Sequence, residues 1–170
     1  MSTSHWPEWA DALAAMNERD RAAAVALRDR FAELGETEPE HAAYSEITEN
    51  IPQLARFLAL RHIWPRLIDN WTDPGALERV PAARRLLAAG ADRDDLARVA
   101  RSAAYDTAFA LLYSLSADGR DYEAPEDTPG WVLMETTPED ELTGRMVQAL
   151  HEDLVTMDPS GRDGADFLFE

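Results

Sequence analysis

The sequence of 170 residues contains no cysteine and no lysine, and all 16 of its basic side chains are arginine. Without cysteine the chain has no disulfide, no thiolate nucleophile and no Cys-ligated zinc or iron–sulfur site. Without lysine it cannot form a Schiff base, and it lacks the lysine of a phosphate-binding P-loop. We therefore expect no cofactor.

Long hydrophobic runs are also missing. The longest uninterrupted apolar stretches, Ala22–Leu27 and Ala108–Tyr113, span six residues each. A helix that crosses a bilayer needs about 20 apolar residues, so we expect no membrane association. The N-terminal region carries Glu8 and Asp11 and no positively charged stretch, unlike a secretory signal. We expect a cytoplasmic protein.

Acidic side chains dominate the charge. The 33 Asp and Glu residues outnumber the 16 arginines and give a net charge of −17. Residues 1–50 carry a net charge of −7, residues 51–101 carry +3, and residues 102–170 carry −13. Because direct binding to nucleic acid needs a basic surface, we expect no nucleic-acid partner. The arginines of the middle stretch are expected to pair with the acidic ends of the chain, although they could form a second docking surface or bind a phosphate or carboxylate ligand.

Helical signals fill the first two thirds of the chain. Asn17 and Asp92 each precede an acidic residue by three positions, as helix N-caps do, and Gly35 follows an apolar stripe as a helix terminator. Pro65 is expected to kink or break a helix. These signals predict a single all-α domain over residues 1–170, an irregular bundle of about six or seven helices.

The composition changes near Gly119. Residues 118–141 hold nine acidic side chains, three prolines and a single arginine, which is typical of a loop. Within this segment Trp131–Glu135 reads as a strand that is too short to anchor a sheet. The apolar spacing of residues 142–157 predicts a further helix. We therefore expect an acidic loop in the C-terminal part and at most one short hairpin.

Two patterns resemble metal sites without meeting their requirements. Glu38 and His41 have the Glu-x-x-His spacing of metal-binding helix bundles, but such a site needs the motif twice, and Pro39 places this one at a helix start. Residues 158–164 are similar to a calcium-binding loop whose glycine comes one position late, with Arg162 at a ligand position. We interpret that stretch as a helix-ending turn and expect no metal site.

The acidic segment 118–141 is the candidate functional region. It is either a solvated loop that keeps the protein soluble or a docking surface whose carboxylates steer a basic protein partner. Aromatic side chains would anchor that partner, although we expect Trp131 to be buried and to hold the loop against the helices. The predicted partner-binding residues are Asp121, Tyr122, Glu123, Glu126, Asp127, Trp131 and Glu135.

The sequence contains no assembled catalytic motif such as Gly-x-Ser-x-Gly, so no catalytic residue is assigned. We therefore expect a non-enzymatic bacterial interaction protein, such as an immunity, antitoxin-like or adaptor protein. One alternative is a small helical enzyme or ligand-binding protein with a pocket formed by His62, Trp64, Trp71 and His151. Another is a nucleic-acid mimic, which needs carboxylates spaced like phosphates. The apolar residues Phe167–Phe169 are expected to pack back on the domain, with insertion into a partner as the alternative.

Four short motifs in the C-terminal third carry a resemblance. They are Trp131-x-Leu133-x-Glu135, Thr143-Gly144-Arg145, Leu150-His151-Glu152-Asp153 and Asp158-Pro159-Ser160-Gly161. Together they resemble small acidic uncharacterised proteins of GC-rich, actinobacterial-type bacteria, an origin that fits the abundant alanine and the replacement of lysine by arginine. The resemblance implies no particular activity.

Overall fold

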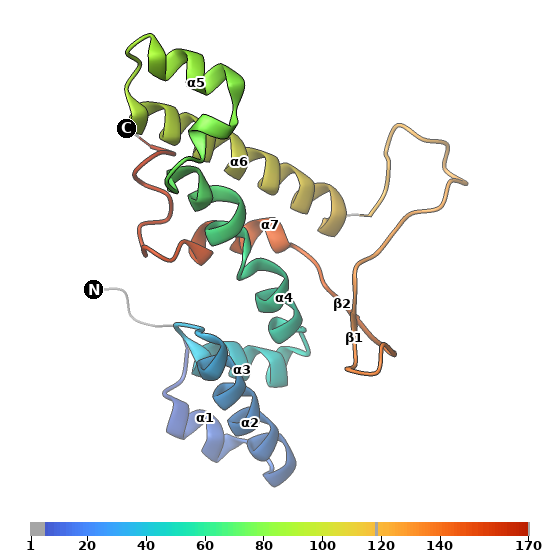
Figure 1. The fold of residues 1–170 in the computed structure, drawn as a ribbon. Coiled ribbons are helices and arrows are strands. Elements are labelled where there is room, and N and C mark those ends of the chain that lie inside the picture. Colours follow the sequence, from blue (N-terminus) through green and yellow to red (C-terminus); the bar gives the residue numbers. More distant parts are fainter. Residues whose placement is uncertain (1–5, 118, 170) are drawn as a thin grey trace. The chain divides into compact units, whose positions relative to one another are not determined.

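The helix ends in the computed structural model follow the local signals in the sequence (Figure 1). The Asn17 side chain accepts a hydrogen bond from a backbone N–H at the start of α2 (Glu18–Leu34), and Gly35 ends this helix with a φ of 89°. The Asp92 side chain accepts two backbone N–H bonds at the start of α6 (Arg93–Ser116). The predicted caps at these positions are confirmed.

The structure describes residues 6–117 and 119–169, so Asp118 of the acidic segment lies outside the described residues. Contacts group the chain into two compact units, which are described separately. The single domain over residues 1–170 stays a prediction. Unit 1 comprises Met1–Leu58 and Met134–Val147, and unit 2 comprises Ala59–Leu133 and Gln148–Glu170.

Unit 1 buries small and aromatic side chains between its helices. Ala24 and Phe31 of α2 and Ala43, further along the chain, are fully buried, and the Phe31 ring meets the Phe57 ring edge-on with centroids 5.9 Å apart. Burial of such apolar side chains is the main stabilising contribution to a unit of this size. Besides α2, its helices are α1 (Trp9–Ala15), α3 (Pro39–Glu49) and most of α4 (Gln53–Leu60).

A two-stranded antiparallel hairpin completes unit 1. Strand β1 (Met134–Thr136) pairs with β2 (Leu142–Met146), and the N–H of Thr137 donates to the carbonyl of Glu141 at 2.8 Å across the connecting turn. The helix predicted over residues 142–157 is therefore wrong in its first part. Gly144 has a φ of 82°, which a helix does not accommodate. The expected short hairpin is present.

Unit 2 contains short, irregular helical segments around one long helix, α6. Pro65 lies in a π-helix, η1 (Trp64–Ile68), so the expected disturbance at this proline is confirmed as a widened turn. Besides α6 and η1, its helical segments are η2 (Asp69–Thr72), η3 (Leu77–Arg79), α5 (Pro81–Ala88), α7 (Leu150–Asp153) and η4 (Val155–Met157).

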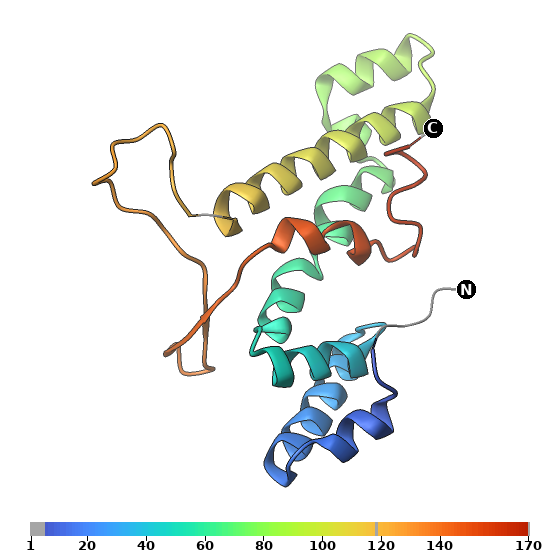
Figure 2. The same cartoon turned by 180° about the vertical axis from the view of Figure 1, so that it is seen from behind.

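The core of unit 2 forms around Trp64. Trp64, Ile68, Ala108 and Leu154 are buried together, and the indole N–H of Trp64 donates to the carbonyl of Leu154 at 2.6 Å. Figure 2 shows the C-terminal segment returning to the first half of α6. There the Phe167 ring meets the Trp64 ring with centroids 5.8 Å apart, so the predicted packing of the tail is confirmed for Phe167.

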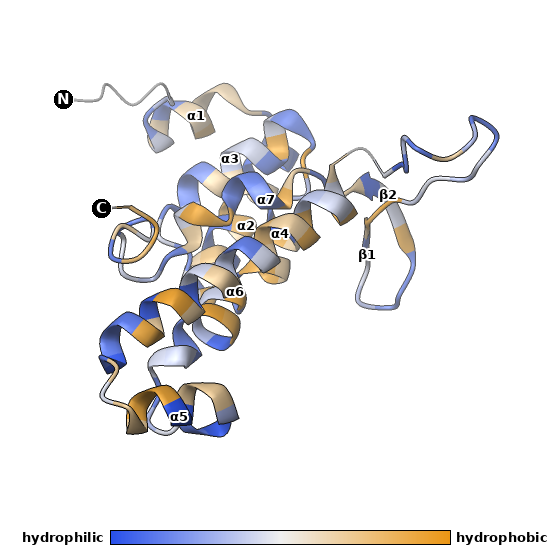
Figure 3. Cartoon of the chain, turned by 90° about the horizontal axis from the view of Figure 1, so that it is seen from above, coloured by the Kyte–Doolittle hydropathy of each residue, from blue (hydrophilic) through white to orange (hydrophobic). Residues whose placement is uncertain are grey.

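The fold is mostly helical, as predicted, with one small sheet in the part of the chain that the structure describes. None of the described helices combines the length and apolar character that crossing a bilayer requires. In Figure 3 orange, hydrophobic segments recur along α6, whereas much of the loop that follows it is blue. That loop carries most of the predicted partner-binding residues.

Candidate functional site

The acidic loop, defined as residues 119–133 of unit 2, is closed at its base by backbone contacts. The N–H of Trp131 donates to the carbonyl of Gly119 at 2.8 Å. A Cβ atom on Gly119 would overlap the backbone oxygen of Trp131, and one on Gly130 would overlap the oxygen of Gly119. The two chain segments therefore approach this closely because both positions are glycine.

A side-chain hydrogen bond attaches the loop to α6. The indole N–H of Trp131 donates to the carbonyl of Ser114 in the last turns of the helix, at 3.1 Å. The predicted burial of Trp131 is wrong, because its side chain is 41% exposed. The loop projects beyond the end of α6 (Figure 1), which leaves part of the indole uncovered. The predicted anchoring of the loop through Trp131 is nevertheless present.

Two turns shape the outer part of the acidic loop. The N–H of Ala124 donates to the carbonyl of Asp121 at 3.2 Å, and the N–H of Thr128 donates to the carbonyl of Pro125 at 2.9 Å. The Asp121 carboxylate also accepts the N–H of Glu123 at 2.9 Å, as aspartate often does in turns. All five predicted partner-binding residues on these turns are exposed: Asp121, Tyr122, Glu123, Glu126 and Asp127.

Six of the seven predicted partner-binding residues thus lie on one loop, with Tyr122 76% exposed. Four carboxylates and the single Arg120 give residues 119–133 a net charge of −3. Carboxylates gathered on an exposed loop attract cations and steer oppositely charged partners over about one Debye length. The loop can bind basic groups through charge and through its aromatic side chains.

The seventh predicted residue, Glu135, is placed elsewhere. It belongs to β1 in unit 1, and its carboxylate binds both Nε (2.7 Å) and a terminal nitrogen (2.5 Å) of Arg145. The same arginine donates to Glu46 at 2.9 Å, and the second oxygen of Glu46 accepts the backbone N–H of Leu54 at 2.8 Å. Glu135 therefore pairs with Arg145 within the hairpin, and Arg145 in turn holds the hairpin against the helices of unit 1 through Glu46.

The four residues of the alternative pocket have different surroundings. Trp64 is fully buried in the core of unit 2, Trp71 is half-buried on η2, and His62 is exposed. Partial desolvation and the nearby Arg66 and Arg61 lower the pKa of His62 below its ordinary value. His151 on α7 lies edge-on to two rings of α6, with centroids 5.3 Å from Phe109 and 4.9 Å from Tyr113. Of these four residues, Trp64 already donates its only polar hydrogen to Leu154.

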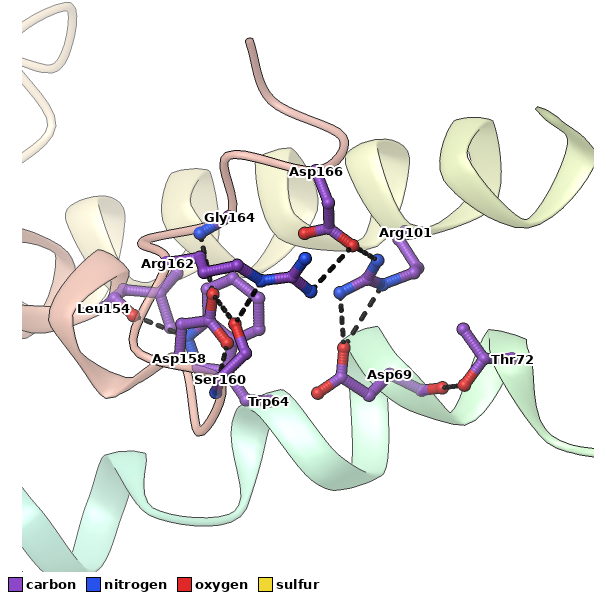
Figure 4. Close-up of polar contacts among 10 residues, drawn as sticks. All are labelled: Trp64, Asp69, Thr72, Arg101, Leu154, Asp158, Ser160, Arg162, Gly164 and Asp166. Atoms are coloured by element: carbon purple, nitrogen blue, oxygen red, sulfur yellow. Dashed lines mark hydrogen bonds and ion pairs between the residues drawn. The ribbon is translucent and has the colours of Figure 1, made fainter. Parts of the chain in front are cut away.

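An ion-pair network ties the C-terminal segment to α6 (Figure 4). Arg101, which is buried, donates to Asp69 at 2.8 Å and to Asp166 at 2.5 Å, and its guanidinium lies 4.1 Å from the centroid of the Phe167 ring. Burial alone would lower the pKa of Arg101, but the two carboxylates raise it above its ordinary value. For Arg101, the expected pairing of a central arginine with the acidic C-terminal part is confirmed.

Residues 158–164, which are similar to a calcium-binding loop, donate hydrogen bonds to the carboxylate of Asp158 (Figure 4). Asp158 accepts the N–H of Gly164 and both the N–H and the hydroxyl of Ser160, each at 2.8 Å. Burial alone would raise the pKa of Asp158, but these donors and the charge of Arg101 lower it below its ordinary value. The carboxylate oxygens are occupied by loop donors, as a helix-ending turn requires.

The Glu-x-x-His pattern also forms a local pair. Nδ1 of His41 lies 3.2 Å from a carboxylate oxygen of Glu38, and the His41 ring meets the Trp6 ring with centroids 4.0 Å apart. Among the described residues, no three His, Asp or Glu side chains are grouped so that they could hold a metal ion. This pair supports the first turn of α3.

One feature near the acidic loop escapes sequence reasoning. Phe109, Leu112 and Leu115 recur at helical spacing, which predicts a buried face. Phe109 and Leu115 are nevertheless each 38% exposed, and Leu111 and Tyr113, on other sides of the helix, are more exposed still. The end of α6 extends past the residues that pack on its first half, which periodicity alone does not reveal.

Comparison of the chain with protein-family models, curated proteins and solved structures finds no match.

Proposed function

We propose that the protein is a non-enzymatic bacterial interaction protein, of the immunity, antitoxin-like or adaptor kind, that presents its acidic loop to a basic protein partner. The observation that carries the proposal is the set of exposed carboxylates on a loop closed by glycines and attached to α6. Tyr122 and Trp131 are exposed on the same loop, and interface hot spots favour such aromatic side chains.

The hydrogen bonds at the base of the acidic loop support a role as a docking surface rather than as a loop that only keeps the protein soluble. A solvated loop needs no defined base, whereas this one has a backbone bond between Gly119 and Trp131 and an indole bond to Ser114. Holding a loop in one conformation lowers the entropy that is lost when a partner binds. Carboxylates at fixed positions also increase the rate of association with a basic partner.

The surroundings of the pocket residues support an enzymatic function less well. Trp64 contributes its ring to the core, and its indole N–H is bonded to Leu154. His151 packs against Phe109 and Tyr113, and its buried Nδ1 atom has no hydrogen-bond partner among the described residues. A general base must lie within reach of the substrate proton that it accepts, and a further group must orient it.

A capture experiment with matched variants tests the proposal. E123Q/E126Q/D127N neutralises three loop carboxylates, and E8Q/D11N/E18Q neutralises three exposed carboxylates of unit 1. We expect the parent protein and the unit 1 variant to capture the same basic protein from a bacterial lysate at low salt. The loop variant is expected to retain less than about a tenth of it, and high salt to release it.

Two results would contradict the proposed function. One is the absence of any basic protein in the low-salt capture by the parent protein. The other is equal loss of the captured protein in both variants, which would show that net charge rather than the acidic loop holds it. Neutralising three charges in each variant keeps the net charge of the two variants equal.

A further inference from the structure

Large apolar side chains are exposed around the last two turns of α6. We call Phe109, Leu111, Tyr113 and Leu115 the apolar end of α6; Leu111 is 58% and Leu115 38% exposed. Phe109 and Tyr113, four residues apart, share the face of α6 that contacts the ring of His151. Leu111 and Leu115 form a second exposed pair on another face, because residues two apart in a helix are separated by about 200° around its axis. Large apolar side chains clustered on an exposed surface mark a binding site more often than scattered ones do.

The acidic loop begins where this apolar surface ends. Ser114, whose carbonyl accepts the indole N–H of Trp131, lies between Tyr113 and Leu115 in the sequence. The bond therefore places an exposed indole at the apolar end of α6, followed by Val132, which is also exposed. An apolar surface thus adjoins a loop of exposed carboxylates.

We infer that the apolar end of α6 and the acidic loop together bind a basic amphipathic helix of the partner protein. The inference rests on the proposed function and names the kind of segment that is recognised. The apolar stripe of that helix contacts Leu111, Leu115 and Trp131, and its Arg and Lys side chains face the carboxylates of Glu123 and Asp127. Amphipathic helices bind apolar surfaces through side chains at i, i+3, i+4 and i+7.

The negative charge of the acidic loop favours a basic amphipathic helix over a second copy of the chain as the bound partner. A second copy would bring its own acidic loop, with a net charge of −3, to the same place. Like charges brought together at an interface oppose association. A purely basic, polar segment would satisfy the carboxylates but leave Leu111 and Leu115 exposed to water, so an apolar stripe beside the basic residues fits the whole surface.

Synthetic peptides test the inference. One probe is a fluorescein-labelled peptide of about 18 residues, long enough for five helical turns, with leucines on one helical face and arginines on the other. A second probe has the same composition in a scrambled order that forms no apolar stripe. We expect the parent protein to bind the amphipathic peptide at least about tenfold more tightly than the scrambled one.

Variants of α6 locate the binding surface. L111S/L115S is expected to weaken binding of the amphipathic peptide at least about tenfold and to leave the scrambled peptide unaffected. Val99→Ser changes an exposed apolar residue near the other end of the same helix and is expected to alter affinity by less than about twofold. Circular dichroism of the free variants confirms that the helix content is retained.

The outcomes separate the inference from the proposed function. Equal affinity for the two peptides, or no effect of L111S/L115S, would overturn the inference and leave a charge-driven interaction standing. Failure of both peptides to bind would also overturn the inference, whereas the proposed function is tested separately by the lysate capture. A doubling of the mass of the free protein in solution that L111S/L115S abolishes would show that a second copy occupies the surface, and would also overturn the inference.

Discussion

The indole N–H of Trp131 donates a hydrogen bond to the carbonyl oxygen of Ser114, 17 residues earlier in the chain. The bond satisfies a carbonyl near the end of α6, where helix carbonyls lose their intrahelical partners. It also fixes where the acidic loop rejoins the helix. The positions of the loop carboxylates therefore depend on this contact and on the glycines beside it.

Closure of the loop is expected to depend on Gly119. Gly119→Ala introduces a Cβ that overlaps the backbone of Trp131, so the Gly119–Trp131 hydrogen bond should break. We expect the N–H of Trp131 to exchange with solvent at least about tenfold faster, as measured by NMR. Gly75→Ala is the matched control, since Gly75 has a φ of 81° but open space around it. Equal exchange of Trp131 in parent and Gly119→Ala would contradict the closed base.

Arg101 is expected to stabilise unit 2. Arg101→Met removes the cation between Asp69 and Asp166 and leaves two carboxylates facing each other. Because both carboxylates are half-exposed, we expect a loss of about 1–3 kcal/mol in the free energy of unfolding, measured with urea. Adding D69N/D166N should recover about half of the loss, because the repulsion is removed. Unchanged stability of Arg101→Met would contradict this role.

Acid is expected to weaken the C-terminal segment of unit 2. Burial opposes the shift, but hydrogen bonds and the charge of Arg101 lower the pKa of both Asp158 and Asp166 in the folded protein. Groups with a lowered folded pKa stabilise above their unfolded pKa and lose that contribution as the pH falls through the folded value. The loss should therefore occur below the ordinary value of 3.8. Unfolding of D158N/D166N should lack this part of the acid dependence, and an identical dependence would contradict it.

The hairpin of unit 1 is expected to depend on Arg145. Arg145→Met leaves the carboxylates of Glu46, which is only 6% exposed, and Glu135 without their shared cation. We expect a loss of about 2–4 kcal/mol in the free energy of unfolding, as is typical when one partner of a buried pair is removed. Arg162→Met, which removes an exposed arginine, should cost less than about 0.5 kcal/mol. Equal losses in thermal and urea unfolding of the two variants would contradict the assignment.

Local signals in the sequence predict the helix ends well. Asn17 and Asp92 cap helices because their short polar side chains reach the free N–H groups of the first turn, and this needs only neighbouring residues. Local signals do not predict the structure of residues 142–146, which form strand β2 instead of a helix. Their apolar residues continue at helical spacing, but the strand is stabilised by pairing with β1 and by Arg145, whose partner Glu46 lies 99 residues away.

The candidate site can also be predicted only in part, because some of its features depend on local sequence and others on contacts between distant residues. The acidic and aromatic residues of the loop follow directly from composition, whereas the exposure of Trp131 depends on where α6 ends relative to its neighbours. Glu135 looks like a member of the acidic segment, and only the hairpin register brings it to Arg145. Asp158 occupies the first position of a calcium-like pattern, but its oxygens accept bonds from its own loop.

Hydrogen–deuterium exchange with the captured basic partner tests the central claim most directly. We expect partner binding to slow amide exchange in residues 119–133 and in the last two turns of α6, while the helices of unit 1 keep their exchange rates. The loop variant E123Q/E126Q/D127N should show no such protection at the same partner concentration. Protection confined to unit 1, with unchanged exchange in the acidic loop, would contradict the proposal that this loop is the docking surface.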